Sequence, residues 1–299
     1  MCLKQRVSYL IHRLWHTQKI KQKRGRKAPL FLNDAFVLEL LYKIWYNISR
    51  KSIRRKEISM KSVAMAFYNG AKYIDEQIRS ILDNMAEDDE LIISVDDASD
   101  GSETILKNWV QNDQRIRIIK GPGKGVVKNF ENAIRHCNGD IIYLSDQDDI
   151  WKPDKVEKVN YAFSNPEVKA VLHDAEIVDE NGVATGAASL FSIRGSRAGI
   201  LKNLLKNSYV GCCMAFRKEL IPIICPIPNE MYMHDYWIGT AAEYMGKVCF
   251  LDEPLISYRR HSSNVTQMTH GSIRFMIKKR IDIIRCLGLL KKRVRKVKA

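Results

Sequence analysis

The chain has 299 residues, of which 45% are hydrophobic and 28% are charged, and a formal net charge of +15. This length suits one large α/β domain with extensions and allows a sizeable core. The seven cysteines are odd in number and lack a CxxC spacing, which argues against a disulfide framework and favours reduced, mostly buried thiols in a cytosolic protein.

Charge divides the chain into three parts. Residues 1–61 hold 16 Lys/Arg and 3 Asp/Glu, residues 271–299 hold 11 and 1, and residues 62–270 hold 22 and 30. Basic ends therefore flank an acidic body, and such ends attract the phosphates of an anionic bilayer or of nucleic acid. In residues 273–290 apolar side chains at helical spacing are mixed with basic ones, which predicts an interfacial helix. We favour an anionic membrane surface over nucleic acid as its partner; the alternative is a solvated helix packed on its own domain.

The N-terminal part, residues 1–61, is predicted to be a basic, partly amphipathic helical extension. Its most hydrophobic segment, residues 30–48, is interrupted by the charged side chains Asp34, Glu39 and Lys43. A membrane-spanning helix needs about 20 predominantly apolar residues, so this segment is predicted to form a buried or peripheral helix. No signal peptide with a cleavage site is evident.

The body of the chain alternates apolar runs with helical patterns. An apolar strand begins at residue 62 and ends at an Asn69-Gly70 turn signal, and further strands are expected over residues 90–95, 115–119 and 141–144. Helical spacing follows these runs. This alternation predicts a mostly parallel sheet with helices on its faces.

Three carboxylates within four positions, Asp146, Asp148 and Asp149, follow the last of these strands. Packing them so closely costs electrostatic repulsion unless a cation offsets it. Mg²⁺ and Mn²⁺ bind one or two carboxylates and complete their coordination with water and phosphate oxygens. The stretch therefore predicts a site for a metal and a diphosphate, although an Asp-rich turn that only caps the next helix is the alternative.

Other polar side chains follow the expected strands. In open parallel sheets ligands bind beyond the carboxyl ends of the strands, and Tyr68, Asp97 and Asp148 all come after such ends. Asp97 can accept a hydrogen bond from a nucleobase or serve as a turn residue, and Tyr68 can stack on a base or close a core edge. In the glycine-rich stretch 121–130, Lys128 can meet phosphate at a helix start; a surface turn with solvated lysines is an equal alternative, and the P-loop pattern is absent.

Four motifs in order resemble family-2 glycosyltransferases of the GT-A fold, and most of all the bacterial enzymes that build O-antigen and other surface polysaccharides. The motifs are Phe67-Tyr68-Asn69-Gly70, Val95-Asp96-Asp97-Ala98-Ser99-Asp100-Gly101-Ser102, Gly125-Val126-Val127-Lys128-Asn129-Phe130 and Asp146-Gln147-Asp148-Asp149-Ile150-Trp151-Lys152-Pro153-Asp154-Lys155. The resemblance covers residues 62–265 and implies a Rossmann-like nucleotide-binding domain with a mostly parallel central sheet. The basic helical extensions, residues 1–61 and 266–299, lie outside it.

The resemblance implies a role for each matching residue. Asp97 is the base-reading aspartate, and Tyr68 and Asn69 lie where the first strand meets the nucleotide. Asp146 and Asp148 form the DXD motif, in which Asp148 binds the metal that bridges the donor diphosphate. Asp149 contacts the donor sugar or holds the loop, and we count Lys128 with the donor-binding residues.

Later motifs resemble the acceptor side and the closing loop of the same family. Within His234-Asp235-Tyr236-Trp237-Ile238, Asp235 is the expected catalytic base, with His234 as a tuner, whereas a helix-capping Asp is the alternative. In Tyr258-Arg259-Arg260-His261, either arginine can neutralise the leaving diphosphate, and His261 is a candidate late metal ligand. Gly211–Phe216 resembles the small-residue strand beneath the acceptor pocket, and we assign no chemistry to its thiols.

These features together predict a metal-dependent, inverting hexosyltransferase. It is expected to move a hexose from a UDP- or dTDP-linked sugar to a polyprenyl-diphosphate-linked glycan in O-antigen or capsule synthesis, with Mg²⁺ or Mn²⁺ as cofactor. The expected location is cytoplasmic and peripheral on the inner face of the cytoplasmic membrane, with no nucleic-acid partner. The alternatives are a nucleotidyltransferase and a non-catalytic basic adaptor for membrane or nucleic acid.

Overall fold

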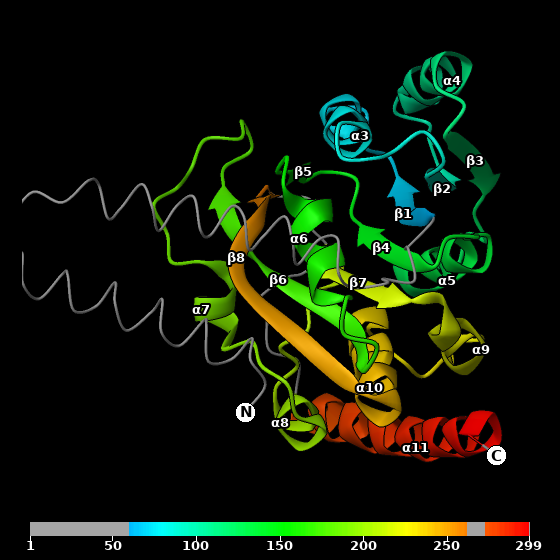
Figure 1. Ribbon diagram of the computed structural model, residues 1–299, viewed down its shortest axis with the longest axis vertical. Coiled ribbons are helices and arrows are strands. Elements are labelled where there is room, and N and C mark those ends of the chain that lie inside the picture. Colours follow the sequence, from blue (N-terminus) through cyan, green and yellow to red (C-terminus); the bar gives the residue numbers. More distant parts are fainter. Residues whose placement is uncertain (1–59, 262–272, 299) are drawn as a thin grey trace, which may run out of the picture. The chain divides into compact units, whose positions relative to one another are not determined.

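The computed structural model describes residues 60–261 and 273–298 (Figure 1). Within these ranges an eight-stranded sheet has the order β3-β2-β1-β4-β7-β6-β8-β5. Its strands are β1 (Lys61–Tyr68), β2 (Glu90–Asp97), β3 (Ile116–Lys120), β4 (Ile141–Ser145), β5 (Ile150–Trp151), β6 (Val168–Val178), β7 (Met214–Arg217) and β8 (Lys247–Arg259).

The sheet has a parallel half and a mixed half. Strands β3, β2, β1 and β4 are all parallel to one another. Strand β7 is antiparallel to both β4 and β6, β6 is parallel to β8, and the short β5 is antiparallel to β8. The predicted α/β fold with a mostly parallel sheet is therefore confirmed. The short strand β5 and the antiparallel direction of β7 were not predicted, whereas a strand within Gly211–Phe216 was expected and β7 overlaps it.

Helices cover both faces of the sheet (Figure 1). On one face lie α3 (Ile74–Leu82), α4 (Ser102–Asn112) and α6 (Lys155–Ala162), and on the other α5 (Val126–Arg135), α9 (Ile221–Ile224), α10 (His234–Met245) and α11 (Ile273–Lys298). The short helices α7 (Leu190–Arg194) and α8 (Ile200–Leu205) belong to the connection between β6 and β7.

Local sequence explains these elements. Residues 63–67 of β1 are apolar and buried, as in a strand covered on both faces, with Met65 on the α3 side and Ala64 on the α5 side. Along α3, Ile74, Ile78 and Ile81 recur at helical spacing and are fully buried. The apolar residues of the strands, together with the helical spacing of apolar residues in the covering helices, thus form one core on each side of the sheet.

The carboxyl ends of β1, β2 and β4 meet at one edge of the sheet. Tyr68 pairs with Asp97 across β1 and β2, and Ser145 of β4 pairs with Met65 of β1. Because the three strands are parallel, the residues that follow them emerge on the same side. The fold therefore brings together the strand ends that the sequence marked as polar.

Helix α11 confirms the helix predicted from the C-terminal apolar spacing. It packs into the core of α9 and α10 through buried residues, namely Ile283, Cys286, Leu290 and Val294. Ile281 and Ile284, from the row predicted to be interfacial, are exposed. In the described ranges no helix is long and apolar enough to cross a bilayer. The predictions for residues 1–59, and the boundary predicted at residue 265, lie outside the described residues.

A pair of neighbouring leucines tests the packing of α11. Leu290 is fully buried whereas Leu289 is 39% exposed. We expect Leu290→Ala to lower the free energy of unfolding by about 2–5 kcal/mol, because it removes buried methyl groups and leaves a cavity. Leu289→Ala should change it by less than about 0.5 kcal/mol. Urea denaturation of both variants measures the difference, and equal small effects would show that α11 does not share the core.

Candidate active site

The ends of β1 and β2 are joined by hydrogen bonds around Asp97. The side-chain amide of Asn69 donates to Oδ2 of Asp97 over 3.2 Å, and the Ser99 hydroxyl donates to the same oxygen over 3.0 Å. Asn69 has a φ of 43°, a left-handed conformation that asparagine tolerates better than most residues. The hydrogen bond from Ser99, with others from Asn69 and two backbone amides, lowers the pKa of Asp97. Asp97 is therefore held as an ionised acceptor beside Tyr68, whose side chain is 61% exposed.

Gln147 ties the acidic stretch to the end of β1. Its side chain accepts from the Tyr68 amide over 2.7 Å and donates to the Tyr68 carbonyl over 2.9 Å. The contact needs a glycine at position 70, since a Cβ there would lie 2.7 Å from Nε2 of Gln147. Buried Gln77 holds the same stretch from α3 by donating to the Ser145 hydroxyl and to the Asp146 carbonyl, both over 2.8 Å. Asp97 and the acidic stretch are thus linked through Asn69, Tyr68 and Gln147.

The three carboxylates of residues 146–149 gather in one cluster, in which Asp149 is buried and Asp146 and Asp148 are half-buried. Burial, Asp148 and Asp235 together raise the pKa of Asp146 to about 7. Burial and the two neighbouring aspartates raise the pKa of Asp149 well above its usual range. Oδ1 of Asp149 accepts from the Arg259 amide over 3.1 Å, whereas its buried Oδ2 has no hydrogen-bond partner among the described residues. The cluster carries more negative charge than its own surroundings neutralise.

Two groups beneath this cluster were not given a role from the sequence. The Cys212 side chain lies with Asp146 and Asp149 in a group whose ligand atoms are within 4.8 Å of one another. A hydrogen bond with Cys213 and burial raise the pKa of the Cys212 thiol, so it remains a donor toward the carboxylates. Lys155 is 1% exposed, and burial lowers the pKa of its ammonium to about 8.

The surroundings of Lys155 explain how its charge is accommodated. Its Nζ lies 3.7 Å from the ring centroid of Trp151 and donates to the Cys212 carbonyl over 3.3 Å. The nearby Asp149 and Asp146 favour its charged form. A buried cation therefore lies under the acidic stretch, and its only sequence signal was its place in the helix that follows that stretch.

Asp148 pairs with a residue 113 positions away. Nε2 of His261 donates to Oδ2 of Asp148 over 2.9 Å, and the two side chains are 8% and 15% exposed. Burial raises the pKa of Asp148, and the hydrogen bond from His261 opposes this shift. The ring of His261 also lies 4.8 Å from that of Tyr73. The structure thus brings together the two residues predicted to share a metal.

Arg259 fixes the acidic loop. Its Nε donates to the Asp148 carbonyl over 2.9 Å, Nη1 to the Glu180 carbonyl over 3.0 Å and Nη2 to the Glu76 carboxylate over 2.6 Å. The side chain is buried, and its guanidinium lies 4.8 Å from the Tyr73 ring. Arg259 therefore holds the loop that presents Asp148. Arg260 is exposed, and its backbone amide donates to the Val178 carbonyl.

Asp235 lies in the first turn of α10 and not at its cap. Met233 occupies the N-cap position, so Asp235 is not the N-cap residue, although its Oδ1 accepts from the backbone amide of Tyr236 in the same first turn over 2.6 Å. Asp235 is 3% exposed, and its Oδ1 accepts from the Asn207 amide over 3.2 Å. Its effect on the pKa of Asp146 places it within electrostatic reach of the acidic cluster. A shared site for Asp235 and the donor-side carboxylates stays a prediction.

Two other predicted residues, His234 and Lys128, make their contacts outside the acidic cluster. His234 stacks on Phe130 with ring centroids 4.0 Å apart, burial lowers its pKa to about 3, and its ring nitrogens have no hydrogen-bond partner in the part of the chain that is described. Lys128 donates to Glu131 over 2.9 Å and to the Ile227 carbonyl. A donor contact by Lys128 stays a prediction.

The acidic cluster fits a hard divalent cation. It offers carboxylate oxygens, one buried oxygen without a partner, and an imidazole beside Asp148. Such oxygen ligands suit Mg²⁺ or Mn²⁺. Asp148, Asp146 and His261 are the residues that would hold the ion.

Comparison with known proteins defines the family. Residues 62–222 match the glycosyl transferase family 2, so the chain belongs to that family. It is 28% identical over 239 residues to the dTDP-rhamnosyl transferase RfbG of Shigella flexneri, a match that covers 74% of this chain and 79% of RfbG. It is 26% identical over 211 residues to an uncharacterized glycosyltransferase of Nostoc sp., with 68% of this chain and 65% of the relative covered.

A solved structure shares the fold. Residues 1–349 of TarS from S. aureus, in complex with UDP-GlcNAc, superpose with a TM-score of 0.57 at 14% identity, covering 75% of this chain and 65% of that one. The family match supports glycosyl transfer as the enzyme class and gives no support to nucleotidyl transfer or to a non-catalytic adaptor.

Adjacent arginines test the role of Arg259. We expect Arg259→Lys to lower the free energy of unfolding by about 1.5–3 kcal/mol, because a lysine cannot reproduce the contacts to Glu76, Glu180 and Asp148. Arg260→Lys should change it by less than about 0.5 kcal/mol, since Arg260 is exposed. Thermal and urea unfolding measure both values, and equal losses would contradict the clamp.

The raised pKa of Asp146 gives a pH-dependent prediction. Between its unfolded pKa of about 4 and its folded pKa of about 7, the folded chain binds more protons at this group, so its stability falls as pH rises through that window. At pH 8 with chelator, Asp146→Asn should therefore be roughly 1–3 kcal/mol more stable than wild type, and the gain should shrink at pH 5.

The opposite sign is expected at Asp113, which serves as the control for the pH experiment. The hydrogen bond from Arg115 lowers the pKa of Asp113, so Asp113→Asn should lose stability at pH 8. Urea unfolding at both pH values measures these differences. A loss of stability in Asp146→Asn at pH 8 would contradict the repulsion within the cluster.

Proposed function

We propose that the chain is an inverting hexosyltransferase that uses a UDP- or dTDP-linked sugar and acts on a hydroxyl of a lipid-linked oligosaccharide in O-antigen or capsule synthesis. The observation that carries this proposal is that Asp235 lies near enough to the acidic cluster for its charge to raise the pKa of Asp146. A base and a donor-binding site must adjoin for a single displacement at the anomeric carbon.

The donor side is assigned to the sheet edge. Asp97, kept ionised by Ser99 and Asn69, is suited to accept a hydrogen bond from a nucleobase, and exposed Tyr68 offers a ring for stacking. The names of RfbG and of the TarS complex refer to nucleotide sugars, which supports a donor of this class. Asp149 holds the loop through the Arg259 amide and leaves one oxygen for the donor sugar.

The chemistry is divided between the two sides of the site. Asp235 takes the proton of the acceptor hydroxyl as the new bond forms, and Asn207 orients its carboxylate. A bound divalent cation would neutralise the departing diphosphate, held by Asp148, Asp146 and His261. Arg260 is exposed next to His261 and is the arginine whose guanidinium remains available for the diphosphate, whereas Arg259 contributes by positioning the loop.

A membrane surface is the proposed place of the acceptor. Helix α11 leaves apolar and basic side chains exposed together. They include Ile281, Ile284, Lys291, Lys292 and Arg295. Such a mixed surface suits the headgroup region of an anionic bilayer. We therefore propose a peripheral position on the inner face of the cytoplasmic membrane, where polyprenyl-diphosphate carriers present their glycans, and no nucleic-acid partner.

Two substitutions separate the proposed roles. We expect Asp148→Asn and Asp235→Asn each to lower kcat by about 10²–10⁴-fold. Asp148→Asn should also lose Mn²⁺-dependent binding of the nucleotide sugar, whereas Asp235→Asn should keep it because the base faces the acceptor. The assay uses the full chain, a panel of UDP- and dTDP-sugars, Mn²⁺ and a lipid-linked acceptor.

Asp154→Asn is the matched control for this assay, since Asp154 is an exposed carboxylate paired with Lys158. It should keep wild-type turnover. The proposal fails if wild type neither hydrolyses nor transfers any sugar of the panel, and either assignment fails if its variant turns over normally.

A further inference from the structure

A second pocket lies outside the acidic site. It has a volume of about 810 Å³ and is lined by the loop before α5 and by α5 itself on one side, and by Pro228, Asn229 and Met231 on the other. The lining includes none of the strand-end or acidic residues, that is, neither Tyr68, Asp97, Asp146, Asp148 nor Asp235. This volume falls within the range of about 300–1,000 Å³ that is typical of small-molecule sites.

The charge of the pocket is positive. Three cationic side chains, Lys124, Lys128 and Arg135, line it together with a single carboxylate, Glu131. Glu131 is 7% exposed and accepts from Lys128 over 2.9 Å and from Arg135 over 2.8 Å. Lys124 is exposed, and its ammonium makes no hydrogen bond or ion pair within residues 60–261 and 273–298. One carboxylate thus serves two cations and leaves a third without a partner.

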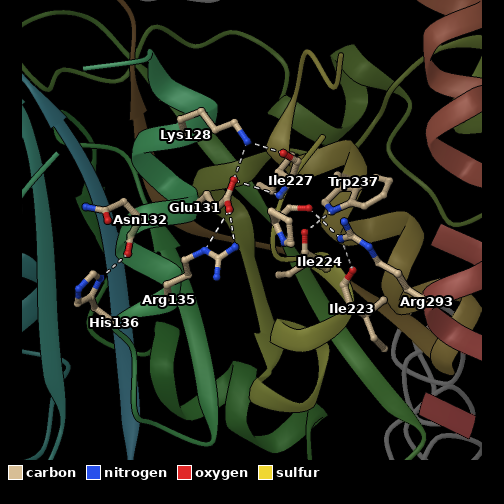
Figure 2. A network of polar contacts seen from close by, with 11 residues as sticks. Lys128, Glu131, Asn132, Arg135, His136, Ile223, Ile224, Ile227, Trp237 and Arg293 are labelled. Atoms are coloured by element: carbon tan, nitrogen blue, oxygen red, sulfur yellow. Dashed lines mark hydrogen bonds and ion pairs between the residues drawn. The ribbon is translucent and has the colours of Figure 1, made fainter. Parts of the chain in front are cut away.

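The far wall of the pocket is held in place by two helices (Figure 2). From α5, Glu131 accepts from the Ile227 amide over 3.0 Å, and Lys128 donates to the carbonyl of the same residue. From α11, Arg293 donates to the carbonyls of Ile223 and Pro226 over 2.9 and 2.8 Å. The wall is therefore fixed before any ligand arrives, which lowers the entropic cost of binding.

The pocket lies beside the acceptor half of the active site. Residues 228–231 lead directly into α10, whose first turn carries Asp235. On the opposite face of α5, Phe130 stacks on His234. The start of α10, which carries the proposed base, thus flanks the pocket. Arg293 connects the wall of the pocket to α11, the helix whose basic side chains are exposed.

We propose that this pocket binds the diphosphate group of the acceptor's prenyl carrier, an inference that rests on the proposed function. Clustered lysine and arginine side chains form strong charge-assisted hydrogen bonds with phosphate oxygens. Lys124, whose ammonium has no hydrogen-bond or ion-pair partner among the described residues, supplies the main attraction. Lys128 and Arg135 add to it, although both also pair with Glu131. This assignment gives Lys128 to the acceptor and not to the donor. The nucleotide donor carries the same diphosphate chemistry, so the test must distinguish the two sources.

Direct binding of a short prenyl diphosphate tests the pocket. The full chain, with chelator to keep divalent ions from the acidic cluster, is titrated with geranyl diphosphate, with geraniol and with UDP. We expect Lys124→Glu to raise the Kd for geranyl diphosphate about tenfold and Arg135→Gln to raise it roughly three- to tenfold. The matched control is Lys120→Glu, which makes the same charge change at an exposed residue outside the lining and should stay within about twofold of wild type.

Three outcomes would overturn the assignment. They are an unchanged Kd for geranyl diphosphate in Lys124→Glu, geraniol binding as tightly as geranyl diphosphate, and displacement of geranyl diphosphate by UDP with an equal loss of UDP affinity in Lys124→Glu. The last would give the pocket to the donor.

Asp148→Asn separates the pocket from the proposed catalytic function. This variant should lose turnover but bind geranyl diphosphate as wild type does. If wild type uses a nucleotide sugar and Lys124→Glu binds geranyl diphosphate normally, only the pocket assignment fails. If no nucleotide sugar is used but the binding depends on Lys124, the diphosphate site stands and the catalytic proposal fails.

Discussion

The active site depends on holding several like charges close together in a buried place. Two unit charges about 4 Å apart repel by roughly 4 kcal/mol at the effective dielectric of a protein surface, and the carboxylates of residues 146–149 are joined by that of Asp235. The chain offsets part of this repulsion with Arg259, Lys155 and the Cys212 thiol. The compensation is incomplete, which leaves the cluster suited to attract a cation. The carboxylate repulsion therefore lowers the stability of the fold at the site where catalysis is proposed.

The strand ends were the part of the site most open to sequence reasoning. Apolar runs of residues 62–67, 90–95 and 141–144 located the parallel strands, and the rule that ligands bind beyond their carboxyl ends singled out Tyr68, Asp97 and Asp148. Local periodicity is sufficient here because each strand's pattern depends on its own residues. The contact of Asp148 with His261 came only from resemblance to a family, since nothing in the spacing of 113 residues predicts it.

Contacts between distant segments explain what could not be predicted. Arg259 and Arg260 are chemically identical in the sequence, yet Arg259 is the last residue of β8 and is buried against Glu76 and Glu180, whereas Arg260 follows the strand and is exposed. Lys155 lies in the first turn of a helix, a position that does not by itself indicate burial. The contacts with Trp151 and Cys212 that enclose it come from other parts of the fold. In α11 two apolar rows were available, and the surfaces of α9 and α10 select the one that contains Leu290.

The packing of α11 also bears on what constitutes the smallest working unit. The family match ends at residue 222, whereas the proposed base lies on α10 and the buried row of α11 reaches Val294. A fragment cut at the limit of the match would lack the base, and one cut before Ile273 would expose the apolar surfaces of α9 and α10 to water. Such a fragment would be prone to aggregate, because this half of the core closes only when α11 is present.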